Sequence, residues 1–262
     1  MKQVFLMLVL LVGLGGCMEN SYPLDGFSEK QKVLVKAIKA ADVEKVKELV
    51  KVTDLEMKND QSLPILTAAM FEAMGDLKSD KPTKRLQIIT ELVRAGAKVN
   101  KGGIFLDTPL AIALAQEHPA LLEAMLAGGL DPNFVKERSP IIFEIRSNYR
   151  LDLMKVLVKY GANIEAQDTV GETPAHANIV TAPKISYYLV SIGANLDSQN
   201  RYTGKTFAMS VFEMEKSFAK SVENIKTGKR DGFIEVAEGN LDAVQKIKAI
   251  MIEKGIEWPP KQ

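Results

Sequence analysis

Residues 168–176 read Asp-Thr-Val-Gly-Glu-Thr-Pro-Ala-His, and this stretch decides the fold. The Thr173-Pro174 pair is typical of a helix start, because threonine caps free backbone N–H groups and proline at the first helical position has no N–H to leave unpaired. The residues in front of this pair predict an extended hairpin, which we call a finger. A helix preceded by a finger is therefore expected here.

The same elements recur along the chain with a period near 33 residues. Four segments share one helix ending, and their glycines, Gly96, Gly129, Gly161 and Gly193, lie 33, 32 and 32 residues apart. A glycine there can take the left-handed conformation that lets the chain turn out of a helix. Matching helix starts precede three of these glycines by 19 to 21 residues, at Thr108-Pro109, Ser139-Pro140 and Thr173-Pro174. Each period predicts two helices and a finger.

This pattern resembles the ankyrin repeat over roughly residues 30–258. The resemblance implies an all-α fold, a solenoid of helix-turn-helix repeats with short hairpin fingers and about six to seven repeats including caps. Residues 237–244 resemble the family's turn between helices, which gives seven repeats, whereas a long insertion would leave six. Another insertion is expected between Pro64 and Gly96, which are 32 residues apart, with a polar, turn-rich centre at residues 72–84.

The N-terminus predicts an export signal followed by an anchor. Lys2 precedes an apolar run over residues 4–13 that is too short to span a bilayer. The following Leu-Gly-Gly-Cys, residues 14–17, resembles the bacterial lipobox, in which the cysteine is lipidated and becomes the new N-terminus. An ordinary secretory signal or a short buried helix is the alternative. We expect a lipoprotein signal peptide at 1–16, lipidated Cys17 and a tether at 17–29, and a C-terminal tail at 259–262.

The residues around Cys17 bear on location. Two or three acyl chains on this cysteine would anchor the chain stably to a membrane. Met18 follows, whereas Asp at this position favours inner-membrane retention in enteric lipoproteins, so the resemblance implies the outer membrane, facing the periplasm. Met18 is also a candidate start for an unlipidated form. Cys17 is the one cysteine, so the chain can form no internal disulfide and no thiolate metal cluster.

Composition and motifs argue against nucleic-acid binding and catalysis. Thirty-four basic and 33 acidic side chains give a net charge of +1, whereas duplex affinity depends on clustered Lys and Arg. His118, before Pro119, is expected in a solvated turn. His176 occupies the Thr-Pro-x-His position, where the resemblance implies a structural imidazole bonded to the backbone of neighbouring loops. Neither histidine has a catalytic partner pattern. We predict no enzyme activity, cofactor or metal.

A solenoid of this kind offers a protein partner a concave face made of fingers and first helices. Aromatic and Arg side chains are the usual energetic anchors of protein interfaces. The predicted partner-binding residues are Phe105, Phe134, Lys136, Arg138, Phe143, Arg146, Tyr149, Arg201 and Tyr202. Phe143 is also a candidate for the core, whereas finger residues have little core to join.

Two functions remain open at this point. Small ankyrin lipoproteins are similar to immunity proteins of type VI secretion, which implies that the chain binds and neutralises a secreted lipase or phospholipase toxin in the periplasm. The alternative is a housekeeping scaffold for envelope integrity or oxidative-stress defence, with an endogenous partner. We expect a monomer when unbound, a protein partner, a membrane contact through the lipid anchor, and no nucleic acid.

Overall fold

The computed structural model describes residues 26–56, 63–78, 84–102, 108–136 and 138–261. The predicted signal peptide, Cys17 and the tether up to residue 25 lie outside these ranges, as does the predicted finger residue Phe105. Their roles stay predictions.

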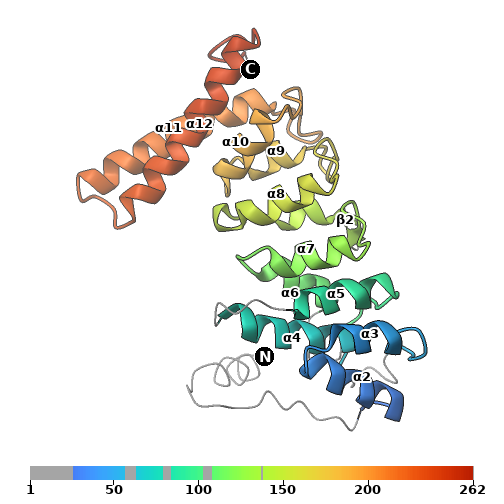
Figure 1. Ribbon diagram of the computed structural model, residues 1–262. Helices are drawn as coiled ribbons and strands as arrows, with labels where there is room; N and C mark the ends of the chain where they lie inside the picture. The colour runs from blue at the N-terminus through green and yellow to red at the C-terminus, as the bar shows by residue number, and fades with distance from the viewer. Residues whose placement is uncertain (1–25, 57–62, 79–83, 103–107, 137, 262) are drawn as a thin grey trace.

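Helix pairs stack in chain order along the described residues (Figure 1). In the fourth pair, two short 3-10 helices stand where the other pairs have an α-helix. The pairs are α2 (Glu29–Lys39) with α3 (Val43–Leu49), α4 (Ile65–Lys78) with α5 (Arg85–Arg94), α6 (Pro109–Ala115) with α7 (Ala120–Ala127), η1 (Ile141–Glu144) and η2 (Asn148–Arg150) with α8 (Leu151–Lys159), α9 (Pro174–Asn178) with α10 (Pro183–Ser191), and α11 (Phe207–Lys226) with α12 (Ile234–Glu253).

The predicted helix ends and two of the three predicted helix starts are confirmed; the third, Ser139-Pro140, is wrong as a cap, because these residues form strand β2 and the 3-10 helix η1 begins at Ile141 without a side-chain cap. The Thr108 hydroxyl accepts the N–H of Ala111 at 3.2 Å, and the Thr173 hydroxyl accepts that of His176 at 3.5 Å. The turn glycines Gly96, Gly129, Gly161 and Gly193 have φ values of +94°, +104°, +92° and +103°. The residue after each glycine donates its N–H to the carbonyl five residues earlier at 3.0 Å, which satisfies a carbonyl at the helix end.

One core runs through the whole stack. It consists of apolar side chains between successive pairs, among them Leu34, Met70, Leu92, Leu121 and Leu157, all essentially inaccessible to solvent. Full burial of one such side chain stabilises a fold by roughly 1.5–3 kcal/mol. Because each pair hides its apolar face against the next, the stack holds together without a disulfide.

Two fingers show antiparallel pairing within the described residues. In the fourth, β1 (Val135–Lys136) pairs antiparallel with β2 (Ser139–Pro140). The sixth finger closes with an antiparallel bridge between Gln199 and Thr206. The expected short hairpin fingers are therefore present between these pairs.

The seven-repeat interpretation is wrong: the described residues contain six pairs. Residues 237–244, expected to form an inter-helix turn, lie inside α12, and α11 is a single helix of 20 residues. One face of α12 is buried on both sides of Gly239, and it consists of Ala237, Val244, Ile247 and Met251. Burial of this face offsets the cost of about 1 kcal/mol that a glycine within a helix carries. The polar centre expected from Glu72 is likewise helical up to Lys78, the end of α4.

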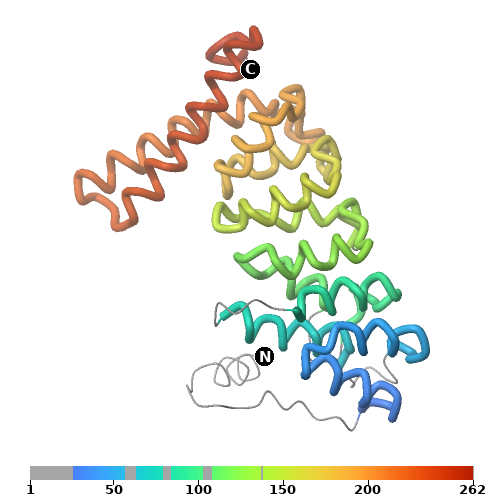
Figure 2. The backbone as a smooth tube through the Cα atoms, in the orientation of Figure 1, coloured from blue at the N-terminus to red at the C-terminus, as the bar shows by residue number. Residues whose placement is uncertain are grey.

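The helices α11 and α12 form a long hairpin that projects from the stack on the side away from the fingers (Figures 1 and 2). We call it the C-terminal hairpin. The Asn148 side-chain amide donates to Asn240 Oδ1 of α12 at 2.8 Å, and Asn148 Oδ1 accepts the N–H of Lys184 at 3.0 Å. Asn148 of η2 is therefore bonded both to α12 and to the start of α10. Within the described ranges, none of the helices combines the length and apolarity needed to cross a membrane.

Candidate functional site

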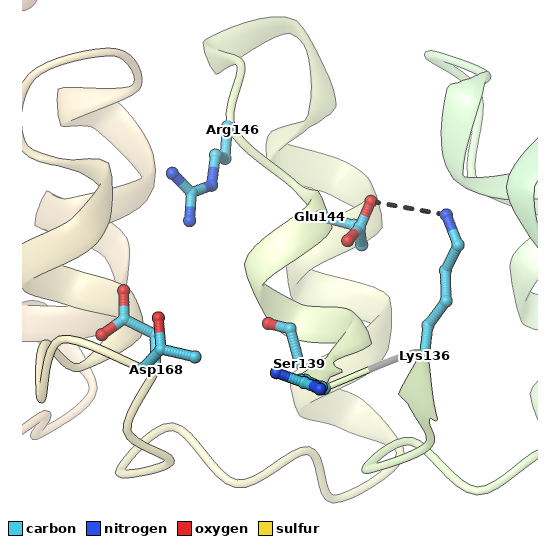
Figure 3. Close-up of a pocket in the computed structure, with 7 residues that line it drawn as sticks. Lys136, Ser139, Glu144, Arg146 and Asp168 are labelled. Atoms are coloured by element: carbon cyan, nitrogen blue, oxygen red, sulfur yellow. Dashed lines mark ion pairs between the residues drawn. The ribbon is translucent and has the colours of Figure 1, made fainter.

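Two neighbouring fingers enclose a polar hollow of about 300 Å³. Lys136, Arg138 and Ser139 come from the fourth finger, Glu144 and Arg146 follow it, and Asp168 and Thr169 belong to the fifth finger. Figure 3 shows Arg146 and Asp168 on one side and the Lys136–Glu144 ion pair on the other. We call this place the finger hollow.

The local fold explains why Glu144 and Arg146 both reach the surface. Ile141, Ile142 and Phe143 of η1 are buried, and Ile145, in extended conformation with φ −94° and ψ 92°, is buried as well. Successive side chains of an extended segment point to opposite sides. Burial of Ile145 therefore turns the residues on either side of it outward.

Cations dominate the finger hollow. Lys136 Nζ lies 3.9 Å from the Glu144 carboxylate. The Asp168 Oδ1 atom accepts the backbone N–H groups of Val170 at 3.0 Å and Glu172 at 2.9 Å. Arg146 donates Nε–H to the Phe143 carbonyl at 2.8 Å, which orients its guanidinium. No described residue forms an ion pair with Arg138 or Arg146.

Of the nine predicted partner-binding residues, the structure brings three together here, namely Lys136, Arg138 and Arg146. The surface placement of Phe143 is wrong, because only 3% of it is exposed and it belongs to the core. Phe134 is half-buried and packs against the same core. Phe105 lies outside the described residues.

The other three predicted residues lie elsewhere. Arg201 and Tyr202 are exposed in the sixth finger, with Tyr202 80% exposed. The Arg201 guanidinium donates to Gln167 at 2.7 Å, and its side chain crosses Gly171, where a Cβ would lie 2.7 Å from Arg201 Cγ. Tyr149 is 70% exposed, but it lies in η2 beside Asn148, so the structure separates it from the fingers.

Sequence reasoning did not single out the apolar surface of the C-terminal hairpin. Phe233 is 80% exposed at its far end, and Phe218, Ile225 and Val236 line a second hollow of about 450 Å³ between the two helices. Phe218, Val222 and Ile225 fall at helical spacing and extend the pattern that begins at Phe207. Dividing this segment into two repeats concealed that signal.

His176 is structural, with partners that differ from the expected backbone groups. Its ring nitrogens lie 3.2 Å from the Ser198 hydroxyl and 2.8 Å from the Ser210 hydroxyl, both in the next repeat. Burial lowers the pKa of His176, and Lys205 lowers it further, while Glu172 and Asp168 act in the opposite direction. The imidazole therefore bridges two repeats. His118 is exposed, as expected, and its Nδ1 accepts the N–H of Ala120 at 3.2 Å.

The described ranges contain no group of three His, Cys, Asp or Glu side chains placed to hold a metal ion.

The stacked pairs, turn glycines and fingers define an all-α ankyrin-repeat solenoid. The structure is similar to that of the ankyrin-repeat protein EF0377, with a TM-score of 0.51 and 17% identity, over 89% of this chain and 99% of that one. It is also similar to an ankyrin repeat domain from Acinetobacter baumannii AYE, with a TM-score of 0.51 and 16% identity, over 84% of this chain and 98% of that one. At these identities the likeness shows the fold alone.

Two curated proteins share part of the sequence. Protein phosphatase 1 regulatory subunit 27 of Homo sapiens is 35% identical over 94 residues, which is 34% of this chain and 47% of that protein. Its Mus musculus counterpart is 45% identical over 51 residues, 19% of this chain and 33% of that protein. The chain thus spans less than half the length of each relative. No family model matches the chain.

Proposed function

We propose that this chain is a lipid-anchored, protein-binding ankyrin module of the periplasm, and that its partner docks on the finger side. The observation that carries the proposal is the finger hollow, where Arg138 and Arg146 are exposed and form no ion pair within the described residues. Arginine is enriched among the residues that dominate binding at protein interfaces. Arg201 and Tyr202 extend the same side toward the sixth finger.

We further propose that the partner is a secreted lipase or phospholipase toxin and that binding neutralises it. Support comes from the resemblance of small ankyrin lipoproteins to immunity proteins of type VI secretion, together with the Leu-Gly-Gly-Cys lipobox at residues 14–17. An anchored module of this kind would hold an incoming enzyme at the membrane and cover its active site. Outer-membrane attachment, which the residue Met18 favours, would hold the module in the compartment where such a toxin is expected to act.

Affinity capture from the native cell tests the docking side. Arg138→Glu together with Arg146→Glu is expected to abolish capture of the partner, because acidic groups of the partner that bind these arginines would be repelled by the new glutamates. Phe134 is left unchanged, since its core contacts would confuse a binding loss with a folding loss. Lys51→Glu with Lys254→Glu is the matched control: both lysines are exposed and give the same change in net charge.

The control pair should capture the partner as the unaltered chain does, and circular dichroism should show equal helix content in all three. Retained capture by the Arg138/Arg146 variant would contradict the finger-side proposal and move the site to the C-terminal hairpin. The identity of the captured protein decides the second step. A lipase-type enzyme supports neutralisation, and an endogenous envelope enzyme supports the scaffold alternative.

The anchor has a separate test. Cys17→Ser is expected to move the protein from the membrane fraction to the soluble fraction, because it removes the thiol that would carry the acyl chains. Unchanged membrane association would contradict the proposed anchor.

A further inference from the structure

We propose that the finger hollow binds a single carboxylate side chain, an Asp or Glu exposed on a protein partner. The inference deepens the proposed function, since it names the chemistry that docks there. It rests on the orientation of Arg146, on the balance of charge in the lining, and on the size of the hollow.

The orientation of Arg146 comes first. Its Nε–H is bonded to the Phe143 carbonyl at 2.8 Å, and Phe143 is fixed in the core. This bond directs the guanidinium while leaving its terminal N–H groups available. Arg138, from the fourth finger, lines the same hollow. A planar guanidinium can donate two parallel N–H groups to one carboxylate, whereas the ammonium group of a lysine acts as a point charge. Two arginines therefore suit a carboxylate ligand.

The balance of charge indicates a monoanion. Among the lining residues that the structure describes, three cations stand against two carboxylates, which leaves one positive charge uncompensated within that set. Glu144 lies against Lys136 at 3.9 Å, and Asp168 Oδ1 is occupied by two backbone N–H groups. A carboxylate ligand would neutralise the hollow, whereas a doubly charged phosphate would leave excess negative charge beside Glu144 and Asp168.

Size and exposure agree with a side chain that arrives as part of a larger interface. The volume of about 300 Å³ is at the lower end of the range for small-molecule sites. Because Arg138 and Arg146 are exposed, solvent screens their attraction for an isolated anion. A free carboxylate should therefore bind weakly but specifically, and a protein carrying one should gain the rest of its affinity from neighbouring finger contacts.

Nuclear magnetic resonance of the arginine Nε–Hε groups tests this on the full chain in detergent at constant ionic strength. The probes are N-acetyl-glutamate amide, its neutral match N-acetyl-glutamine amide, and inorganic phosphate. We expect the Arg138 and Arg146 signals to shift saturably with the glutamate probe and not with the glutamine probe. Arg94, which is paired with Glu91, is the internal reference and should not move.

Arg146→Gln should abolish the saturable shift of the Arg138 signal, and Arg138→Gln should abolish that of the Arg146 signal. Equal shifts with both amide probes, saturation retained in these variants, or tighter binding of phosphate than of glutamate would each overturn the inference. Failure here can be told from failure of the proposed function. Glutamate binding with unchanged partner capture in the Arg138/Arg146 charge-reversal variant would leave the pocket chemistry standing and remove the docking role.

Discussion

Replacing Gly128 with Ala tests how closely successive repeats approach each other. Gly128 is the C-cap of α7, with φ −80° and ψ −8°, a conformation that alanine adopts freely. A Cβ at this position would lie 2.7 Å from the Thr90 carbonyl oxygen and 2.7 Å from Val93 Cβ, both in α5 of the preceding repeat. The cost of Gly128→Ala is therefore a clash between repeats and involves no backbone strain.

The magnitude follows from two opposing effects. Inserting a methyl group into a well-packed contact costs about 1–3 kcal/mol. Alanine also lowers the conformational entropy of the unfolded chain, which stabilises the fold by about 0.4–1 kcal/mol. We expect a net loss of about 1–2 kcal/mol in the free energy of unfolding. For a chain of this size that loss lowers Tm by roughly 2–8 °C.

Urea unfolding followed by circular dichroism measures this loss. Gly75→Ala is the matched control, because Gly75 lies within α4 and a Cβ there meets nothing within 4 Å. That variant should be more stable by about 0.5–1 kcal/mol, since alanine is the better helix former. A Gly128→Ala protein as stable as the unaltered chain, beside a stabilised Gly75→Ala protein, would refute the close approach of α5 and α7.

Three further outcomes are expected. Because burial lowers the pKa of His176 in the fold, the unfolded chain takes up a proton more readily, so the contribution of His176 to stability should be full above about pH 6.5 and fall as the pH drops below it. His176→Gln should reduce the pH dependence of the free energy of unfolding, measured in urea, by up to about 1.4 kcal/mol per pH unit. An identical pH dependence in this variant would exclude His176 as its source. Asn240→Ala removes the hydrogen bond to Asn148 and should lower the free energy of unfolding by about 1 kcal/mol. Amide hydrogen exchange should become faster in the first half of α12 and stay unchanged in α10. Exchange rates that do not differ between these two helices would show that this bond does not hold the C-terminal hairpin. Gly129→Ala, at φ +104°, should cost about 1–2 kcal/mol although its Cβ meets no atom within 4 Å, and a neutral result in urea unfolding would exclude the left-handed turn.

Local signals predicted most of the fold. A Thr-Pro helix start and a turn glycine act within a few residues, so their effects could be predicted without knowing the neighbours, and the structure has them where expected. The last pair was different. Gly239 and Asn240 suggested a turn, but burial of Val244 and Ile247 against the stack carries the helix through them. Helix propensity depends on the local sequence and therefore could not predict the effect of that tertiary contact.

The candidate site could be predicted only in part, because its members come from successive repeats. Arg138 and Arg146 were expected at the surface from their repeat position, but the hollow needs Asp168 of the next finger as well. The inward turn of Phe143 follows from the 3-10 helix that replaces an α-helix, and no spacing rule indicated that replacement. The Ser198 and Ser210 partners of His176 also lie one repeat further along the chain.

Site-specific photo-crosslinking tests most directly whether the fingers are the docking side. A benzophenone side chain would replace Tyr202 in the sixth finger or Phe233 at the far end of the C-terminal hairpin, two aromatic residues that are each 80% exposed. The 20-residue α11, about 30 Å long, separates the two sites. The partner should be crosslinked from position 202 and not from position 233. Crosslinking from position 233 alone would contradict finger-side binding and place the partner on the C-terminal hairpin.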